Sequence, residues 1–201
     1  MTLPPAYFDD LYAAADDPWS LRTRWYERRK YALSAAALPR EQYGDGLEVG
    51  CSVGELTAVL APRCARMTAW DASAAAVATA AARNPGVAVE RRVAPRDRLP
   101  VVDLLVLSEV LYYLAPSDLA VLVEQVRTAV RPGGTLLAVH WRHPVADYPQ
   151  TGDAVHAALR TALDWPRVAA HEEPDLLLDC WVRAAAGDGR AASVAAAEDL
   201  W

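Results

Sequence analysis

The sequence predicts an α/β fold, in which a β-sheet carries helices on both faces. From Gly46 onward, short apolar segments alternate with helix-like segments, and this alternation is typical of the fold class. Val101–Leu107 is apolar except for Asp103, as expected of a strand buried on both faces. A glycine directly follows the first expected strand, where sheets of this class often bind a ligand.

Composition indicates one acidic domain. The chain has 201 residues, of which 53% are hydrophobic, enough for a full core. A net charge of -6 argues against nucleic-acid binding through a broad basic face. Cys51, Cys64 and Cys180 lack zinc-site spacing and are too few for a disulfide framework. Because we find neither a signal peptide nor a membrane-length apolar run, we expect a soluble, cytoplasmic protein.

Two helices are expected before the sheet. The first spans Ala6–Ala15, and the second spans Leu21–Ala37, with Ser20 as its cap and a proline after its end. Tyr26 and Lys30, the only lysine of the chain, share a face of the second helix because they are four residues apart.

The remaining elements follow in alternation. Strands are expected at Gly46–Gly50, Arg66–Asp71, Val87–Val93, Val101–Leu107, Thr135–Trp141, Val168–Glu172 and Leu176–Arg183. Helices are expected at Gly54–Leu60, Ser73–Arg83, Ser117–Val130 with a serine cap, and Asp153–Leu163. Arg131–Gly134 reads as a turn that stops a helix, and Glu173–Asp175 joins the last two strands as a hairpin.

Polar residues follow several of the expected strands. Leu47–Gly54 (LEVGCSVG) turns a strand into a helix, and its glycines let the backbone approach a ligand. Asp71 ends the next strand, where a carboxylate can accept both hydroxyls of a ribose or, alternatively, cap the following helix. The strand Val101–Leu107 delivers four polar residues to the same edge: Ser108, Glu109, Tyr112 and Tyr113.

The glycine-containing turn, the aspartate that ends the second strand, the segment after Val101–Leu107 and the turn Arg131–Gly134 follow one another along the chain. In this order they resemble the class I S-adenosylmethionine-dependent methyltransferases, over about residues 43–183. The chain looks most like the NodS-type enzymes, which N-methylate a free amino group on a partly deacetylated chitooligosaccharide. That resemblance rests on Asp17–Trp19, Trp25–Glu27, Arg29–Lys30, Leu47–Ser52 with Gly54 and Leu56–Thr57, and Glu109–Leu114. It implies a Rossmann-like, mostly parallel sheet of seven strands whose last strand is antiparallel. It also implies an N-terminal helical lid over 1–42, an α/β core over 43–183 and a flexible tail over 184–201.

The resemblance implies S-adenosyl-L-methionine as cofactor, with S-adenosyl-L-homocysteine as product and no metal. Expected cofactor contacts are Trp19, Tyr26, Arg29, Glu48, Gly50, Cys51, Ser52, Gly54, Asp71, Ala72, Ala94, Ser108 and Glu109. Among them, Glu48 lies near the amino group of the methionine moiety, and Ala72 lies beside the adenine. Ser52 stands where most class I enzymes have glycine. Ala94 lies where these enzymes often have an acidic residue that accepts a hydrogen bond from the adenine amino group.

Methyl transfer depends mainly on alignment, because the sulfonium donor is already activated. An amine acceptor must be neutral to attack, so a base would assist it. Candidate bases or orienting groups are Glu109, Tyr112, His140 and His143, of which we expect Glu109, Tyr112 and His143 to be catalytic. Glu109 has cofactor binding as an alternative role, and His140 and His156 have structural alternatives.

We expect a small-molecule acceptor, and the NodS-like segments favour the amino group of an amino sugar or related amine. One alternative is a small-molecule O-methyltransferase of natural-product biosynthesis, and another is a non-catalytic cofactor-binding subunit. A nicotinamide enzyme is disfavoured because Gly50–Gly54 lacks the GxGxxG spacing. We expect a monomer or homodimer without nucleic-acid or membrane partners.

Overall fold

The computed structural model describes residues 1–184, 193–197 and 200. The strands are β1 (Tyr43–Val49), β2 (Cys64–Asp71), β3 (Ala88–Arg91), β4 (Val102–Ser108), β5 (Val130–Trp141), β6 (Arg167–Glu172) and β7 (Leu176–Val182). The helices are α1 (Pro5–Ala14), α2 (Trp25–Ala36), α3 (Glu55–Leu60), α4 (Ala74–Arg83), α5 (Pro116–Ala129), α6 (Gly152–Ala162) and α7 (Val194–Ala197). Two short 3₁₀ helices are η1 (Ala61–Arg63) and η2 (Leu111–Tyr113).

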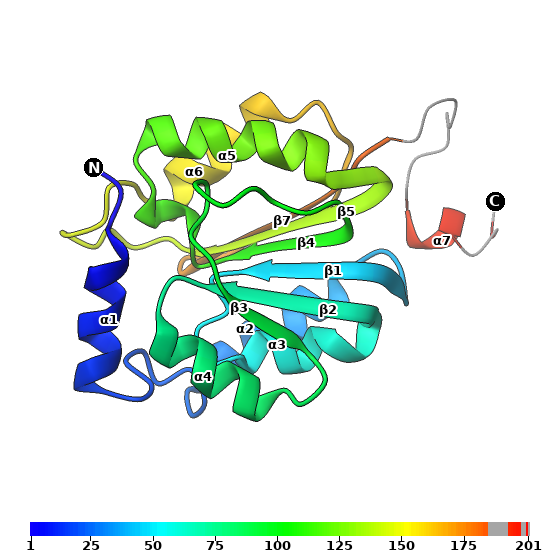
Figure 1. Cartoon of the computed structure of the whole chain (residues 1–201). Coiled ribbons are helices and arrows are strands. Elements are labelled where there is room, and N and C mark those ends of the chain that lie inside the picture. Colours follow the sequence, from blue (N-terminus) through cyan, green and yellow to red (C-terminus); the bar gives the residue numbers. More distant parts are fainter. Residues whose placement is uncertain (185–192, 198–199, 201) are drawn as a thin grey trace.

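The strands form one seven-stranded sheet in the order β3-β2-β1-β4-β5-β7-β6. β7 runs antiparallel to both β5 and β6, whereas every other neighbouring pair is parallel. The predicted mostly parallel sheet with an antiparallel last strand is therefore confirmed (Figure 1).

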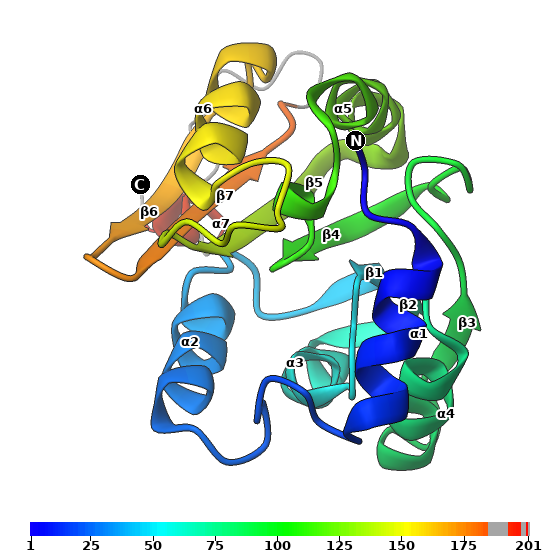
Figure 2. The ribbon, with the colours of Figure 1, turned by 90° about the vertical axis from the view of Figure 1, so that its left-hand side faces the viewer.

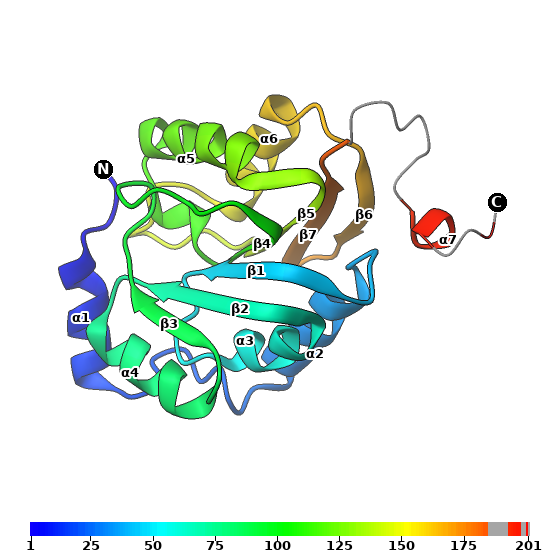
Figure 3. The ribbon, with the colours of Figure 1, turned by 45° about the vertical axis from the view of Figure 1, so that its right-hand side comes forward.

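Helices cover both faces of the sheet, as predicted. α5 and α6 lie on one face and α3 and α4 on the other (Figure 3). Leu122 of α5 and Leu159 of α6 share a core with Leu105 of β4, while Leu60 of α3 shares a second core with Leu104. Leu104 and Leu105 are both fully buried, which confirms β4 as a strand covered on both sides.

The N-terminal segment lies against the carboxyl ends of the strands. α1 crosses in front of β1 and β2 in the end-on view (Figure 2). The backbone N–H of Leu3 donates to the carbonyl of Tyr113 at 2.9 Å, so this segment is tied to η2. The first residues of the chain thus belong to the side of the molecule where parallel sheets bind ligands.

The prediction that Ser20 caps the second helix is wrong. Ser20 has a φ of 57°, and α2 begins only at Trp25. The carboxylate of Asp17 accepts the N–H groups of Leu21 and Arg22 at 2.8 and 3.1 Å, and these bonds form a separate turn before the helix. The serine cap expected at Ser117 is also wrong, because α5 begins one residue earlier, at Pro116.

The predicted turn Arg131–Gly134 is part of a strand instead. β5 begins at Val130, and its pairing with β4 shifts register between Val102 and Leu104. The N–H of Gly133 donates to the carbonyl of Arg183 at 2.7 Å, so the glycines pair beside β7 rather than leaving the sheet. A strand with one irregular step satisfies the backbone here, as in a β-bulge.

The expected flexible tail over 184–201 lies mostly outside the described residues. Within the described ranges, no helix has the length and apolar character needed to cross a bilayer.

Candidate active site

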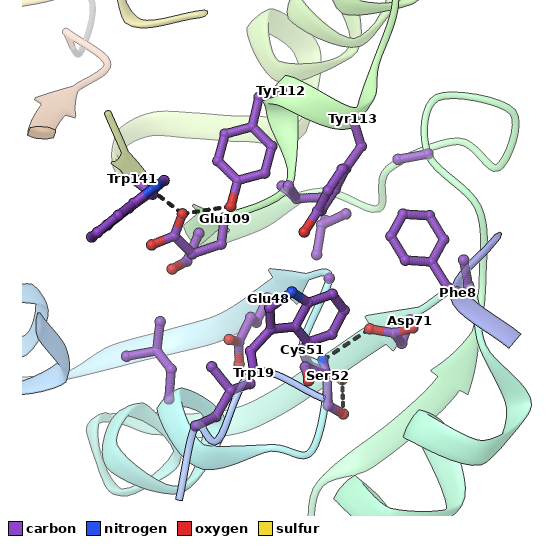
Figure 4. Close-up of a pocket in the computed structure, with 18 of the residues that line it drawn as sticks. Phe8, Trp19, Glu48, Cys51, Ser52, Asp71, Glu109, Tyr112, Tyr113 and Trp141 are labelled. Atoms are coloured by element: carbon purple, nitrogen blue, oxygen red, sulfur yellow. Dashed lines mark hydrogen bonds between the residues drawn. The ribbon is translucent and has the colours of Figure 1, made fainter. Parts of the chain in front are cut away.

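A cavity of about 390 Å³ opens at the carboxyl ends of β1, β2 and β4. Small-molecule sites commonly measure roughly 300–1,000 Å³. β2 lies on one side of β1 and β4 on the other, so the chain changes direction across the sheet here. Ligands of open α/β sheets bind at such a switch point. Phe8 and Trp19 of the N-terminal segment also line the cavity (Figure 4).

The turn from β1 into α3 forms one part of the cavity wall. Gly50 has a φ of 78°, which favours glycine, and a Cβ there would lie only 3.0 Å from Cγ2 of Val110. The N–H groups of Gly50 and Cys51 donate to the carbonyl of Trp70 at 2.8 and 2.9 Å. These two bonds fix the turn against β2.

Ser52 connects this turn to two other elements. Its φ of 51° lies in the left-handed region, which glycine adopts most readily. Its N–H donates to Oδ2 of Asp71 at 2.8 Å, and its hydroxyl shares a short hydrogen bond with the hydroxyl of Tyr12 in α1. The turn, the end of β2 and the N-terminal segment are therefore held together at one residue.

Asp71 ends β2 as a buried carboxylate on the cavity wall. Oδ1 accepts the N–H of Ser73 at 2.9 Å, just before α4 begins. Burial raises the pKa of Asp71, while the N–H bonds of Ser73 and Ser52 oppose that rise. Each carboxylate oxygen keeps a further lone pair, so Asp71 can bind the backbone before α4 and still accept hydroxyl groups of a ligand.

Glu48 lies on the floor of the cavity, and only 2% of its surface is exposed. Thr57 donates its hydroxyl to Oε2 at 2.5 Å, and no cation of the described chain pairs with this carboxyl group. Burial therefore raises the pKa of Glu48 to about 8. A positively charged ligand beside it would favour the ionised form.

Glu109 directly follows β4 and faces the cavity with a φ of 54°. Its carboxylate accepts three hydrogen bonds (Figure 4 shows two of them). Lys30 Nζ lies 2.6 Å from Oε1, while the Tyr112 hydroxyl and the Trp141 N–H donate to Oε2 at 2.7 and 2.8 Å. All three partners are donors, so the group is held firmly as a hydrogen-bond acceptor.

Lys30 reaches Glu109 from α2, and its side chain is only 3% exposed. Nζ also lies 2.7 Å from Oε2 of Glu27. Burial lowers the pKa of Lys30, but Glu109 and Glu27 raise it by more, so the net shift is upward. Lys30 is thus an ammonium group in the cavity wall, not a base. The sequence offered one signal for it, the shared helix face with Tyr26, which also lines the cavity.

Aromatic rings form the wall beside Glu109. Tyr148, from the loop after β5, stacks on Tyr112 with ring centroids 5.1 Å apart. Tyr113 meets Phe8 of α1 edge to face at 5.0 Å. Burial, together with the charge of Glu109, raises the pKa of Tyr112 well above its usual value, so its hydroxyl acts as a donor. Sequence reasoning missed Phe8, Trp141 and Tyr148, and no periodic pattern in their segments marks them.

Most of the predicted site residues meet at the cavity. Those that line it are Trp19, Tyr26, Glu48, Gly50, Cys51, Ser52, Asp71, Ala72, Ala94, Ser108, Glu109 and Tyr112. Three predicted site residues, Arg29, Gly54 and His143, do not line the cavity, and neither does the candidate base His140.

Each of the four has another position. Arg29 points away, and its Nη1 lies 2.6 Å from a carboxylate oxygen in the β6–β7 turn. Gly54 has a φ of 80°, and a Cβ there would come within 2.4 Å of Nδ2 of Asn84, so it allows α3 and α4 to pack closely. His143 pairs at 2.6 Å with an aspartate of the same β6–β7 turn, and its side chain is half exposed. His140 is fully buried, with both ring nitrogens in hydrogen bonds, which matches its structural alternative.

Across the described part of the chain, no three His, Cys, Asp or Glu side chains gather in a way that could hold a metal ion.

Comparison with known proteins identifies the family. The family model of nodulation protein S (NodS) matches residues 9–157, well over half of the chain. Nodulation protein S of Rhizobium tropici is 34% identical over 130 residues, covering 62% of this chain and 55% of that protein. Nodulation protein S of Sinorhizobium fredii is 35% identical over 133 residues, covering 62% and 57%. The matched part thus spans a little over half the length of these relatives.

Solved structures agree in fold. A Pseudomonas syringae protein described as a methyltransferase is 43% identical with a TM-score of 0.70, covering 80% of this chain and 100% of that one. The N-methyltransferase NodS of Bradyrhizobium japonicum WM9, in complex with S-adenosyl-L-homocysteine, is 24% identical with a TM-score of 0.77. That alignment covers 90% of this chain and 99% of the other. The resemblance seen in the sequence is confirmed: the chain belongs to the nodulation protein S family.

Proposed function

We propose that the chain is an S-adenosyl-L-methionine-dependent methyltransferase that acts on the amino group of a small acceptor. One observation carries the proposal. In a chain of the NodS family, the turn at Gly50–Ser52, the carboxylate of Asp71 and the carboxylate of Glu109 line the same cavity. The first two fit the donor molecule, and the third faces the remaining space.

The polar groups of the cavity fit this cofactor. Asp71 offers acceptor oxygens to the two ribose hydroxyls. Glu48, which pairs with no cation among the described residues, offers a buried carboxyl group to the positive charges of the methionine moiety. Ala72 and Ala94 leave room for a flat base beside them. When bound, S-adenosyl-L-methionine supplies a methyl group activated by a positively charged sulfur.

The N-terminal segment 1–42 acts, in this proposal, as a lid over the cofactor. Tyr12 forms a hydrogen bond with Ser52 in the turn from β1 into α3, and Trp19 packs edge to face on Tyr12 with centroids 5.8 Å apart. Lys30 bonds to Glu109 on the other side of the cavity. The lid therefore excludes water from both halves of the site and aligns them, and alignment can contribute roughly 7–11 kcal/mol to such a reaction.

Glu109 orients the acceptor rather than taking its proton. Three donors already direct its two oxygens, and one lone pair on Oε1 remains for an N–H of the acceptor. Lys30 and Tyr112 both act as donors here, so neither accepts a proton. The acceptor amine must accordingly arrive neutral, with its lone pair free to attack the methyl group.

An amino sugar or related amine suits the remaining surface. Trp141 and Tyr26 pack edge to face with centroids 5.3 Å apart and present flat apolar walls beside Glu109. Flat aromatic walls combined with a fixed carboxylate suit a ring-shaped acceptor that carries an N–H group. The B. japonicum relative is an N-methyltransferase, which also supports nitrogen over oxygen.

The proposal is tested by incubating the chain with S-adenosyl-L-methionine bearing a deuterated methyl group and a panel of amino sugars. Fragmentation mass spectrometry should place the label on nitrogen, and Glu109→Gln should lower kcat at least tenfold while S-adenosyl-L-homocysteine binds as before. Label on oxygen would instead indicate an O-methyltransferase. Tight cofactor binding without turnover on any acceptor would indicate a non-catalytic subunit.

A further inference from the structure

A chain of hydrogen bonds crosses the apolar core between α6 and β5 and ends behind the candidate active site. It consists of Asp179, His156 and His140, all fully buried, and the backbone N–H of Leu111. Asp179 Oδ2 lies 2.6 Å from Nδ1 of His156, and Nε2 of His156 lies 3.0 Å from Nδ1 of His140. The Leu111 N–H donates to Nε2 of His140 at 3.2 Å.

The geometry permits only one arrangement of hydrogens along this chain. A backbone N–H can only donate, so Nε2 of His140 must be an acceptor and the hydrogen of His140 must be on Nδ1. Nε2 of His156 then accepts from His140, and the hydrogen on Nδ1 of His156 points to Asp179. Burial is the main cause that lowers the pKa of His140 well below its ordinary value, which keeps this ring neutral.

The Asp179 end of the chain is fixed. Arg160 of α6 and Arg167 of β6 donate to its two oxygens at 2.8 and 2.9 Å. Burial raises the pKa of Asp179, but His156 and Arg160 lower it by more. The carboxylate thus stays ionised and holds the hydrogen of His156 in place.

The other end lies in the segment that carries Glu109. The N–H of Glu109 donates to the carbonyl of Val139 at 2.8 Å, and the N–H of Trp141 donates to Oε2 of Glu109. His140 lies between Val139 and Trp141 and binds Leu111, so three consecutive residues of β5 hold the turn after β4. Three bonds at one turn explain how Glu109 keeps its left-handed φ of 54°.

We infer that His140 is a positioning residue for the candidate active site, with its tautomer fixed by His156 and Asp179. It sets the turn that carries Glu109, and the edge of its ring also contacts Tyr112 at a centroid distance of 5.4 Å. An apolar side chain at this position would leave the Leu111 N–H without its acceptor. The consequence for turnover rests on the proposed methyltransferase function, whereas the tautomer does not.

The first test needs no activity. The chain has four histidines, so ¹⁵N-histidine labelling of the full-length protein gives few signals. We expect His140 to show hydrogen on Nδ1 and a bare Nε2 from pH 5.5 to 9. In Asp179→Asn, the His140 signals should broaden or divide between two tautomers. Hydrogen on Nε2 of His140 in the unmodified chain would overturn the inference.

The second test compares His140→Leu with His140→Gln, whose side-chain carbonyl can accept the Leu111 N–H. We expect kcat to fall at least tenfold in His140→Leu and to recover at least threefold in His140→Gln, with S-adenosyl-L-homocysteine affinity within threefold of the parent. His171→Gln, at a partly exposed histidine outside the chain of bonds, serves as the matched control and should keep kcat.

Equal kcat in folded His140→Leu and the parent would show a role in stability alone and would overturn the inference. If the unmodified chain methylates no acceptor, the proposed function fails instead, and the tautomer measurement still decides the arrangement of the buried chain.

Discussion

Nζ of Lys30 lies 2.6 Å from Oε1 of Glu109, which joins the only lysine of the chain to the residue that follows β4. The same ammonium lies 2.7 Å from Oε2 of Glu27. One cation therefore balances two carboxylates in a nearly closed part of the cavity wall and ties α2 to the sheet. The stability of the N-terminal segment and the geometry of Glu109 depend on the same group.

Replacing the lysine should be costly. Lys30→Met leaves Glu27 and Glu109 without their cation, and removing one partner of a buried ion pair typically costs about 3–5 kcal/mol. We expect a loss of about 3 kcal/mol in the free energy of unfolding, measured by urea denaturation. The double variant Lys30→Met with Glu27→Gln should lose less free energy of unfolding than the two single variants combined. It leaves only the carboxylate of Glu109 without a cation, whereas Lys30→Met alone leaves two. Simple additivity would show that the groups are not coupled.

Glu48 should make the protein less stable as pH rises. Its pKa is about 8 in the folded chain, above the usual value of 4.5, so the folded state holds a proton that the unfolded state has lost between these values. The free energy of unfolding should therefore fall by roughly 1.4 kcal/mol per pH unit between pH 4.5 and 8 from this group alone, and the fall should level off above 8.

Glu48→Gln should remove that part of the pH dependence, because glutamine keeps an acceptor for Thr57 and does not ionise. Thermal unfolding between pH 5 and 9 measures the difference, with Glu41→Gln at an exposed position as the control. A pH profile of Glu48→Gln that parallels the unmodified chain would contradict the expectation.

Gly50 and Gly86 form a matched pair that tests the turn after β1 as a ligand site. Both have positive φ, 78° and 100°, so alanine imposes a backbone cost of about 1–2 kcal/mol at either position. Only at Gly50 would the new Cβ also meet Val110, and only Gly50 lines the cavity. We expect Gly50→Ala to weaken S-adenosyl-L-homocysteine binding at least tenfold in calorimetry, while Gly86→Ala binds as the parent does. Equal affinities would place the ligand elsewhere.

Two predicted site residues should prove dispensable. Arg29 and His143 pair with carboxylates of the β6–β7 turn and do not line the cavity. We expect Arg29→Gln and His143→Gln each to keep kcat and cofactor affinity within about threefold, because exposed ion pairs contribute little. A tenfold loss of kcat in His143→Gln would restore this histidine as a catalytic candidate.

The sheet could be predicted from the sequence because its signals are local. The apolar run of β4 fixed one buried strand, and alternation with helices placed the others around it. Parallel strands bring their carboxyl ends to one edge, so residues following different strands, such as Gly50, Asp71 and Glu109, were expected to meet. The cavity lining agrees with that expectation.

The wall contributed by α2 could be predicted only in part: Tyr26 was expected there and lines the cavity, but the role of Lys30 depends on how the helix rotates against the sheet. Neighbouring helical residues point about 100° apart, so Arg29 reaches the β6–β7 turn while Lys30 reaches Glu109. The polar residues of α2 are spread around the helix, so no apolar stripe in its sequence marks which side is buried. The loop after β5 posed the same difficulty: Tyr148 enters the cavity, whereas His143 lies outside it.

Calorimetric titration of the purified chain with S-adenosyl-L-homocysteine, alongside Asp71→Ala, decides whether this cavity is a cofactor site. We expect one site with a Kd of roughly 1–100 µM in the unmodified chain, within the range common for enzyme ligands, and at least tenfold weaker binding in Asp71→Ala. Absence of binding by the unmodified chain up to about 1 mM, the weak end of that range, would contradict the proposed function.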